Sequence, residues 1–272
     1  MVSVVIPTYN RRALVGEAVA SVRAQRHVAV EIVVVDDGSS DGTAAALTSA
    51  FGDTIRVVCT ENRGVAAARN RGVAATRGDW IAFLDSDDLW LPEKIAAQLT
   101  FFTLRPDADI CQTQEIWVRN GVRLNPCAHH RKPSGDIFAP SLHRCLVSQS
   151  AVMMRRRLYE RAGGFDESLP ACEDYDLWLR IARHTPVWVV DRPLVIKRGG
   201  HVDQLSRRFW GMDRFRAAAL AQLLADGSLA QKHRAMAAAV LAEKCRILAH
   251  GAARRGRHDE AERYRLLATA HA

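Results

Sequence analysis

The 272-residue chain has no apolar run that approaches the roughly 20 residues needed to cross a lipid bilayer. It also has no recognisable secretory signal, because Met1 runs straight into an apolar stretch over 2–6. Its six cysteines form no Cys-x-x-Cys pair, which argues against a disulfide framework. These absences predict a cytoplasmic protein with reduced thiols, with contact at the inner face of the membrane as a further option.

Two other absences narrow the class of protein. No Gly-x-Gly-x-x-Gly follows the first expected strand, so the dinucleotide-binding motif is missing. The net charge of +8 comes mostly from residues 207–272, which carry 13 Lys and Arg against 6 Asp and Glu. No nucleic-acid-reading motif accompanies this charge. We therefore expect no nucleic acid partner, and a solvated helical face or an anionic membrane surface explains the basic residues as well.

The N-terminal half alternates apolar strands with helical patterns. The expected strands are 2–6, 30–35, 55–59 and 80–84. Asn10 is a good N-cap for an expected helix over 12–25. This alternation is typical of an α/β fold with a mostly parallel central sheet flanked by helices.

Beyond residue 107 the alternation weakens. The expected elements there are a helix over 173–184, short strands near 187–190 and 194–197, and helices over 207–225, 229–251 and 258–271. We therefore predict an α/β domain over 1–206 and a basic, all-helical C-terminal extension over 207–272. The extension can pack on the α/β domain, pair two protomers or touch a membrane.

Three carboxylates crowd the end of the fourth expected strand, at Asp85, Asp87 and Asp88. Two unit charges about 4 Å apart repel by roughly 4 kcal/mol at an effective dielectric near 20. Such a cluster must face water or meet a cation. Mg²⁺ and Mn²⁺ prefer oxygen ligands, and Mg²⁺ usually shares one or two carboxylates with substrate phosphates. The alternative is a solvated turn before the next helix.

Polar residues also follow two other expected strands. Tyr9, Asp37 and Asp85 each lie just past a strand end. In parallel sheets the ligands bind outside the carboxyl ends of the strands. The sequence therefore predicts one site at this edge of the sheet.

Several motifs, taken in order, resemble those of family 2 glycosyltransferases. They are Pro7-Thr8-Tyr9-Asn10, Val35-Asp36-Asp37-Gly38, Asn62-Arg63-Gly64 with Ala68-Arg69-Asn70, Phe83-Leu84-Asp85-Ser86-Asp87-Asp88, Gly163-Gly164-Phe165-Asp166 and Glu173-Asp174-Tyr175-Asp176. The resemblance covers about 1–206. It implies the glycosyltransferase-A fold and an inverting enzyme that uses a nucleotide-diphosphate sugar, expected to be a UDP-sugar, and a divalent cation, Mn²⁺ or Mg²⁺. The implied acceptor is a saccharide or lipid-linked hydroxyl, as in cell-surface polysaccharide or glycolipid synthesis.

The resemblance also implies which residues bind the donor: Pro7, Tyr9, Asp37, Arg69, Asn70 and Asp85. Tyr9 resembles the aromatic residue that packs on the nucleotide base, and Asp37 the acid that accepts a hydrogen bond from it. Arg69 and Asn70 stand where the family often contacts the nucleotide. From the residues alone, Tyr9 can instead be a core or loop aromatic, and Asp37 can form the turn before a helix at 41–51 and cap that helix.

The expected metal ligands are Asp87, Asp85 and His201. Asp85 and Asp87 resemble the family's Asp-x-Asp, with Asp87 the direct ligand and Asp85 serving the ribose. In some relatives a histidine near the position of His201 completes the metal shell. A histidine in a loop is otherwise structural or solvated.

Inversion requires a general base opposite the departing diphosphate. Three acids begin the helix expected at 173–184: Glu173, Asp174 and Asp176. At about 100° per residue, Asp174 shares a face with Leu177, Trp178 and Ile181, whereas Asp176 points nearly the opposite way. Both this geometry and the resemblance select Asp174 as the catalytic base. The alternative is an acid that meets the helix dipole.

Two other functions stay open at this stage. A nucleotidyltransferase would need a Gly-rich, basic loop after the first strand, and Pro7-Thr8-Tyr9-Asn10 is not such a loop. A non-catalytic nucleotide-sugar-binding subunit of a polysaccharide assembly would share the donor motifs without turnover.

Overall fold

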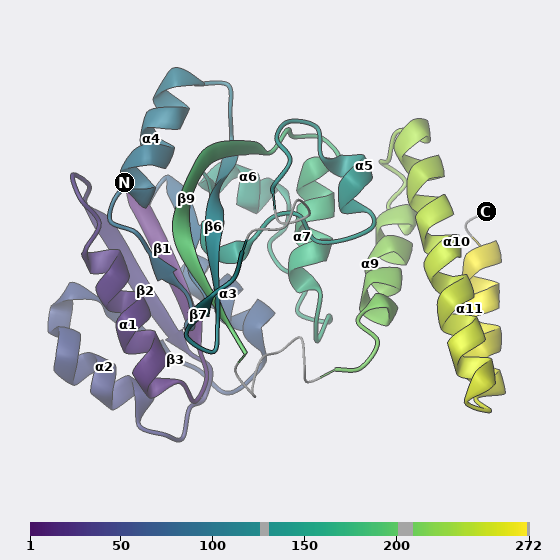
Figure 1. Ribbon diagram of the computed structural model, residues 1–272, viewed down its shortest axis with the longest axis horizontal. Helices are drawn as coiled ribbons and strands as arrows, with labels where there is room; N and C mark the ends of the chain where they lie inside the picture. Colours follow the sequence, from purple (N-terminus) through teal and green to yellow (C-terminus); the bar gives the residue numbers. More distant parts are fainter. Residues whose placement is uncertain (126–130, 201–208, 271–272) are drawn as a thin grey trace.

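The computed structural model describes residues 1–125, 131–200 and 209–270. Within these residues a nine-stranded sheet follows the order β3-β2-β1-β4-β8-β6-β9-β5, with β7 paired to β6 (Figure 1). The strands are β1 Val2–Thr8, β2 Val30–Asp36, β3 Arg56–Cys59, β4 Trp80–Phe83, β5 Leu89–Trp90, β6 Ile110–Arg119, β7 Val122–Arg123, β8 Val152–Arg155 and β9 Trp188–Gly199.

The first four strands are parallel, as the alternation predicts. Val2 of β1 pairs with Val30 of β2 and with Trp80 of β4, and β3 continues the parallel set beside β2. Beyond β4 the sheet is mixed, because β8 is antiparallel to both β4 and β6 while β9 runs parallel to β6. The parallel half thus presents the carboxyl ends of β1, β2 and β4 on one edge.

One long strand replaces the two short strands expected near 187–190 and 194–197. Strand β9 covers Trp188–Gly199, and its register against β6 shifts around Gln114, opposite Pro193. Proline has no N–H to donate to a ladder, so an irregularity at this point lets the strand continue. Strand β5, which the sequence did not reveal, pairs with β9 through Leu89 and Trp90.

Helices cover both faces of the sheet. Those on one face are α1 Arg12–Arg23, α2 Thr43–Phe51 and α4 Lys94–Leu104; those on the other are α3 Val65–Ala74, α6 Arg156–Arg161 and α7 Glu173–Ala182. Alternate residues of β1 face the two layers, with Val4 and Ile6 in the first core and Val5 in the second. Short helical turns at α5 Phe138–Ser141, η1 Gly52–Thr54 and η3 Gln149–Ala151 complete this part.

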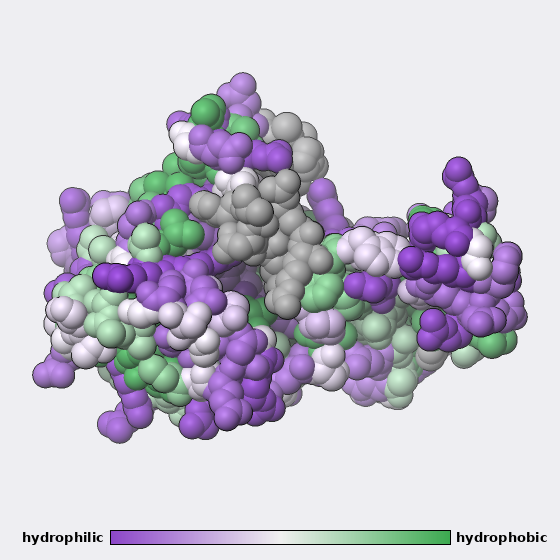
Figure 2. Space-filling view, turned by 90° about the horizontal axis from the view of Figure 1, so that it is seen from below, coloured by the Kyte–Doolittle hydropathy of each residue, from purple (hydrophilic) through white to green (hydrophobic). Residues whose placement is uncertain are grey.

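The C-terminal helices are α9 Asp213–Ala225, α10 Gln231–Arg254 and α11 His258–Thr269, close to the predicted ranges. Leu220 and Leu223 of α9 and Leu241 of α10 belong to the same apolar core as Trp178 of α7. The extension therefore packs on the α/β part, and α11 packs against α10 at the outer end (Figure 1). In Figure 2 the surface over these helices is mostly hydrophilic.

None of the helices in the described ranges is both long and apolar enough to cross a membrane.

Candidate active site

A cleft of about 1280 Å³ opens at the carboxyl ends of the parallel strands. Pro7 lines it from the end of β1 and Tyr9 from just after that strand, Asp37 lies after β2, and Asp85 and Asp87 lie after β4. The convergence predicted from the sequence is therefore confirmed. Asp174, at the start of α7, lines the same cleft, as do the basic residues Arg11 and Lys197.

Asp37 is held by the loop that follows β3. Its two carboxylate oxygens accept hydrogen bonds from the backbone N–H groups of Arg63 (3.0 Å) and Gly64 (2.9 Å). Burial raises the pKa of Asp37, and these two donors offset part of that rise. The alternative role before α2 belongs to Asp41, whose carboxylate accepts from the backbone N–H of Thr43 at 3.0 Å. Asp37 is thus left facing the cleft.

Tyr9 is not a core residue, since 47% of it is exposed at the cleft. The neighbouring Asn10 does not cap α1 as expected. Its φ is 51°, and its side-chain oxygen accepts from the backbone N–H of Ser40 at 2.8 Å. Helix α1 begins after Arg11 with no side-chain cap. Asn10 therefore ties the loop after β1 to the loop after β2, which orients the Tyr9 segment.

Arg69 of α3 joins two carboxylates across the floor of the cleft. Its guanidinium lies 2.9 Å from Asp85 and 2.6 Å from Glu173. Only 5% of Arg69 is exposed, and burial alone would lower its pKa, but the two carboxylates outweigh burial and raise it. Arg69 lines the cleft as predicted, while its charge is already matched within the protein.

Asn70 has a different place from the one expected. It is not among the residues that line the described cleft. Its amide nitrogen donates to the Phe165 carbonyl and to Glu167, both at 2.9 Å, and its oxygen accepts from Tyr159 at 2.6 Å. Since these contacts use both N–H groups and the oxygen of the Asn70 amide in holding the turn at 163–167, they give no support to the expected nucleotide contact, which stays a prediction.

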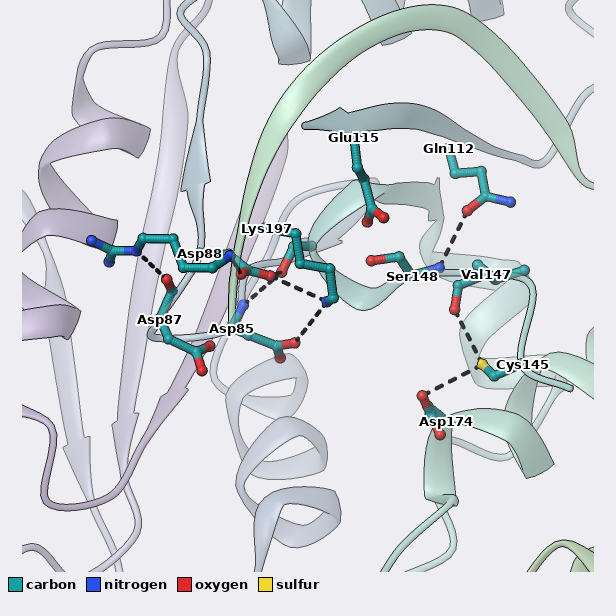
Figure 3. A network of polar contacts seen from close by, with 12 residues as sticks. Asp85, Asp87, Asp88, Gln112, Glu115, Cys145, Val147, Ser148, Asp174 and Lys197 are labelled. Atoms are coloured by element: carbon teal, nitrogen blue, oxygen red, sulfur yellow. Dashed lines mark hydrogen bonds and ion pairs between the residues drawn. The ribbon is translucent and has the colours of Figure 1, made fainter. Parts of the chain in front are cut away.

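The three acids after β4 have distinct surroundings (Figure 3). Asp88 is 1% exposed and accepts from Ser150 Oγ (2.6 Å), from Lys197 Nζ (3.3 Å) and from the Arg198 backbone N–H (2.9 Å). Burial raises the pKa of Asp88 to about 6; Lys197 opposes the rise, while Asp85 and Asp87 add to it. Asp88 is therefore a buried anchor for β9.

Asp85 and Asp87 face the cleft. Burial would raise the pKa of Asp85, but Arg69 and Lys197, the latter 4.0 Å away, outweigh burial and hold it below its usual range. The Asp87 carboxylate lies 2.8 Å from the Arg11 guanidinium. Cations thus already surround these two carboxylates.

The donor set at this point suits a divalent ion. Asp85 and Asp87 offer carboxylate oxygens at the cleft, and Mg²⁺ commonly takes one or two such ligands beside substrate phosphates. No group of three His, Cys, Asp or Glu side chains that could hold a metal by itself is found within the part of the chain that the structure describes. His201 lies outside the described residues.

The three acids of α7 are separated by their partners. Glu173 is buried against Arg69, and Asp176 binds Arg180 at 2.6 Å, away from the cleft in a second pocket behind α7. Asp174 is half-buried at the cleft, where Oδ2 lies 3.4 Å from Cys145 Sγ (Figure 3). Asp174 is therefore the acid of α7 that no arginine neutralises in the described structure.

Helix α7 does not have the single inward-facing stripe that its sequence predicts. Helix α7 is buried around almost its whole circumference, and Leu179, off the expected stripe, is only 1% exposed. Helix α9 packs against α7 and so covers part of its surface that the single-stripe pattern predicted to be exposed. Trp178, on the face shared with Asp174, is 2% exposed and lies in the core.

Sequence reasoning missed several side chains of the cleft, among them Arg11, Lys197 and Cys145. Arg11, just before α1, and Lys197 of β9 reach the acids from parts of the chain that are far apart in the sequence. Cys145 comes from the irregular segment after α5. None of the three belongs to a motif, so only the assembled fold reveals them.

Comparison with known proteins assigns the chain to a family. The model described as glycosyl transferase family 2 matches residues 3–163, more than half of the chain. The chain belongs to glycosyl transferase family 2. A second model, described as glycosyltransferase like family 2, matches residues 134–224 and so reaches into α9.

Two relatives and one solved structure illustrate the likeness. An uncharacterized glycosyltransferase of Rickettsia conorii is 32% identical over 76% of this chain and 35% of its own length. The putative teichuronic acid biosynthesis glycosyltransferase TuaG of Bacillus subtilis is 32% identical over 67% of this chain and 72% of its own. The chain thus spans only about a third of the rickettsial relative.

The solved structure is S. aureus TarS 1–349 in complex with UDP-GlcNAc. It superposes with a TM-score of 0.73 at 21% identity, over 89% of this chain and 71% of the TarS 1–349 chain. The predicted glycosyltransferase-A fold is confirmed by this likeness, which at such identity speaks for the fold alone.

Proposed function

We propose that this protein is an inverting glycosyltransferase that moves a sugar from a nucleotide-diphosphate donor to a hydroxyl acceptor. One observation carries the proposal: Asp87 and Asp174 line the same cleft although they are far apart in the sequence. Asp87 follows β4, and Asp174 lies at the start of α7. Donor and acceptor can therefore meet between a phosphate-binding end and a carboxylate base.

In this proposal Tyr9 packs on the nucleotide base and Asp37 accepts its N–H. Both lie at the cleft, and Asp37 is fixed by the backbone of Arg63 and Gly64. Asp85 serves the ribose and Asp87 the diphosphate end. Arg69 keeps Asp85 in place and links it to α7.

Asp174 takes the proton from the acceptor hydroxyl as the new glycosidic bond forms. Its carboxylate fits this role because its described contacts are with uncharged groups. These are the Cys145 thiol at 3.4 Å and the backbone N–H of the adjacent Tyr175 at 2.7 Å. Glu173 and Asp176 cannot do the same while each is matched to an arginine.

A divalent ion, Mn²⁺ or Mg²⁺, would be held by Asp87 with Asp85 nearby. In this proposal His201 would be a further ligand of the ion. The ion would supply positive charge to the departing diphosphate. Arg11 and Lys197, which now face these acids, would supply further positive charge at the same end of the cleft.

A UDP-sugar donor is favoured by the fold shared with a TarS complex that contains UDP-GlcNAc. The proposed acceptor is a saccharide or a lipid-linked hydroxyl, and the name of TuaG, which refers to teichuronic acid biosynthesis, favours a saccharide. We propose action in cell-surface polysaccharide or glycolipid synthesis at the inner face of the membrane. The basic helices α10 and α11 would contact the membrane or a second protomer.

The test is transfer and donor hydrolysis with UDP-Glc, UDP-GlcNAc and GDP-Man, with Mn²⁺ and after chelation by EDTA. Asp87→Ala and Asp174→Asn should each lower turnover at least 100-fold. Asp79→Ala is the matched control, because Asp79 is exposed and pairs only with the N-terminal amine. Nucleotide-sugar binding without turnover would favour the non-catalytic subunit, and full activity in both variants would reject the assignments.

A further inference from the structure

The segment 145–150 crosses the cleft from the proposed base to the acidic cluster. At one end, Cys145 Sγ lies 3.4 Å from Asp174 Oδ2. At the other end, Ser150 Oγ donates to Asp88 at 2.6 Å and accepts from the Asp85 backbone N–H at 3.1 Å. Figure 3 shows Cys145, Val147 and Ser148 in the stretch between Asp174 and Lys197. A group bound between the proposed base and the proposed diphosphate end of the cleft therefore lies beside this segment.

Gln149 lies near the end of this segment, directly before Ser150, and has an unusual environment. It lines the cleft, yet it is only 4% exposed. Neither its amide oxygen Oε1 nor its amide nitrogen Nε2 has a hydrogen-bond partner in the described residues. Buried amides in folded proteins are nearly always paired, because leaving them unpaired is costly.

Other buried glutamines of the chain behave in the ordinary way. Gln98 accepts from Lys94 Nζ at 2.8 Å and donates to the Ala151 carbonyl at 3.1 Å. Gln112 donates to the Leu146 carbonyl at 3.0 Å and accepts from the Ser148 N–H at 3.2 Å. The unpaired amide of Gln149 is therefore specific to the cleft, because the buried amides of Gln98 and Gln112 are both hydrogen-bonded.

The backbone around Gln149 is fixed on both sides. Gln112 holds Leu146 and Ser148 before it, and Trp90 Nε1 donates to the Ser150 carbonyl after it at 2.7 Å. A side chain on so constrained a backbone is preorganised for a ligand, which reduces the ordering cost of binding.

We propose that Gln149 binds the transferred sugar of the nucleotide-sugar donor. An amide offers both donors and an acceptor, which matches a ring that carries neighbouring hydroxyl or acetamido groups. In the proposed function this sugar lies between the diphosphate at Asp87 and the base Asp174, and Gln149 lines the cleft from the segment that joins these two ends. The inference rests on that proposed function and adds a residue that selects the sugar.

The test compares nucleotides with and without a sugar. Binding of UDP, GDP, UDP-Glc, UDP-GlcNAc and GDP-Man is measured by calorimetry and thermal shift, without acceptor, for wild type, Gln149→Met and Gln98→Met. Since the Gln149 amide is unpaired, the Met variant should keep or raise the ligand-free Tm. It should bind UDP or GDP as wild type does, and the preferred nucleotide-sugar about 10-fold more weakly.

Gln98→Met supplies the matched control, because it loses paired hydrogen bonds outside the cleft. It should lower the ligand-free Tm and leave both kinds of ligand binding unchanged. Equal loss of UDP and UDP-sugar binding in Gln149→Met, or unchanged binding of every nucleotide-sugar, would overturn the inference. Absence of any nucleotide binding by wild type would instead overturn the proposed function itself.

Discussion

The guanidinium of Arg69 lies 2.6 Å from the carboxylate of Glu173, and Glu173 directly precedes Asp174. The same guanidinium bonds Asp85 at 2.9 Å. One buried cation of α3 thus connects the end of β4 with the first turn of α7. Because these two elements carry the proposed diphosphate and base residues, Arg69 fixes the two halves of the cleft relative to one another.

Replacing Arg69 should destabilise the fold strongly. Arg69→Met leaves Glu173, with a side chain only 5% exposed, and Asp85 without their shared cation. Removing one partner of a buried pair costs about 3–5 kcal/mol. Urea unfolding should record a loss of this size. Arg63→Met is the control, since its pair with Glu167 is exposed and should contribute less than about 1 kcal/mol. Equal effects of both variants would contradict the structural role of Arg69.

Asp174 and Asp176 should have opposite phenotypes although they are two residues apart. Asp174→Asn should lower turnover at least 100-fold with little change in Tm, because Asp174 faces the cleft with few partners. Asp176→Asn should lower Tm and leave the turnover of folded protein near wild type. Asp176 holds Arg180, and Arg180 in turn donates to the Gly164 carbonyl at 2.7 Å.

Asp88 should give a stability that falls as the pH rises. Burial raises its pKa from 3.8 to about 6, so between these values the folded state binds more protons than the unfolded state. Its contribution is present at low pH and is lost as the pH passes through about 6. From pH 5 to pH 8 the free energy of unfolding of wild type should fall by about 1.4 kcal/mol relative to Asp88→Asn.

The control for this titration is Asp226→Asn. Its ion pair with Arg183 lowers the pKa of Asp226 to about 2, so its own titration lies below the tested range. The difference between wild type and this variant should stay flat from pH 5 to pH 8. A flat difference between wild type and Asp88→Asn over the same range, measured by urea unfolding, would show instead that Asp88 is ionised throughout.

Lys94 is a buried lysine whose ammonium group lacks a carboxylate partner in the described contacts. Its Nζ donates to Gln98 Oε1 at 2.8 Å and lies 3.9 Å from the centre of the Trp90 ring. Burial lowers its pKa well below 10.5. Below pH 10.5 the folded state then binds fewer protons than the unfolded state, so stability should rise with pH.

The measurement is urea unfolding between pH 7 and pH 10. Wild type should gain up to about 1.4 kcal/mol per pH unit relative to Lys94→Met, which cannot titrate. Lys232→Met, on the exposed face of α10, should show no such difference. A flat wild-type profile relative to Lys94→Met would mean that Lys94 is charged in the core.

Local patterns in the sequence were enough for the parallel half of the fold. Continuous apolar stretches such as 30–35 become strands covered on both faces, and the polar residues after them converge because parallel strands end on one edge. Elements set by distant partners were missed or divided. Strand β5 has only two residues and forms through its pairing with β9. Strand β9 contains an irregularity at Pro193, where the sequence pattern predicts a gap between two separate strands.

The sequence by itself determined the family, the parallel strands and the acids that gather at the cleft, since apolar periodicity and short motifs are local properties. Only the tertiary structure decided which acids stay available. Asp85, Asp88, Glu173 and Asp176 each meet a cation contributed by another part of the chain or by the next helical turn, whereas Asp174 meets a thiol. Charge compensation in a protein interior depends on which side chains folding brings within a few ångströms, and that information does not lie in any short stretch of residues.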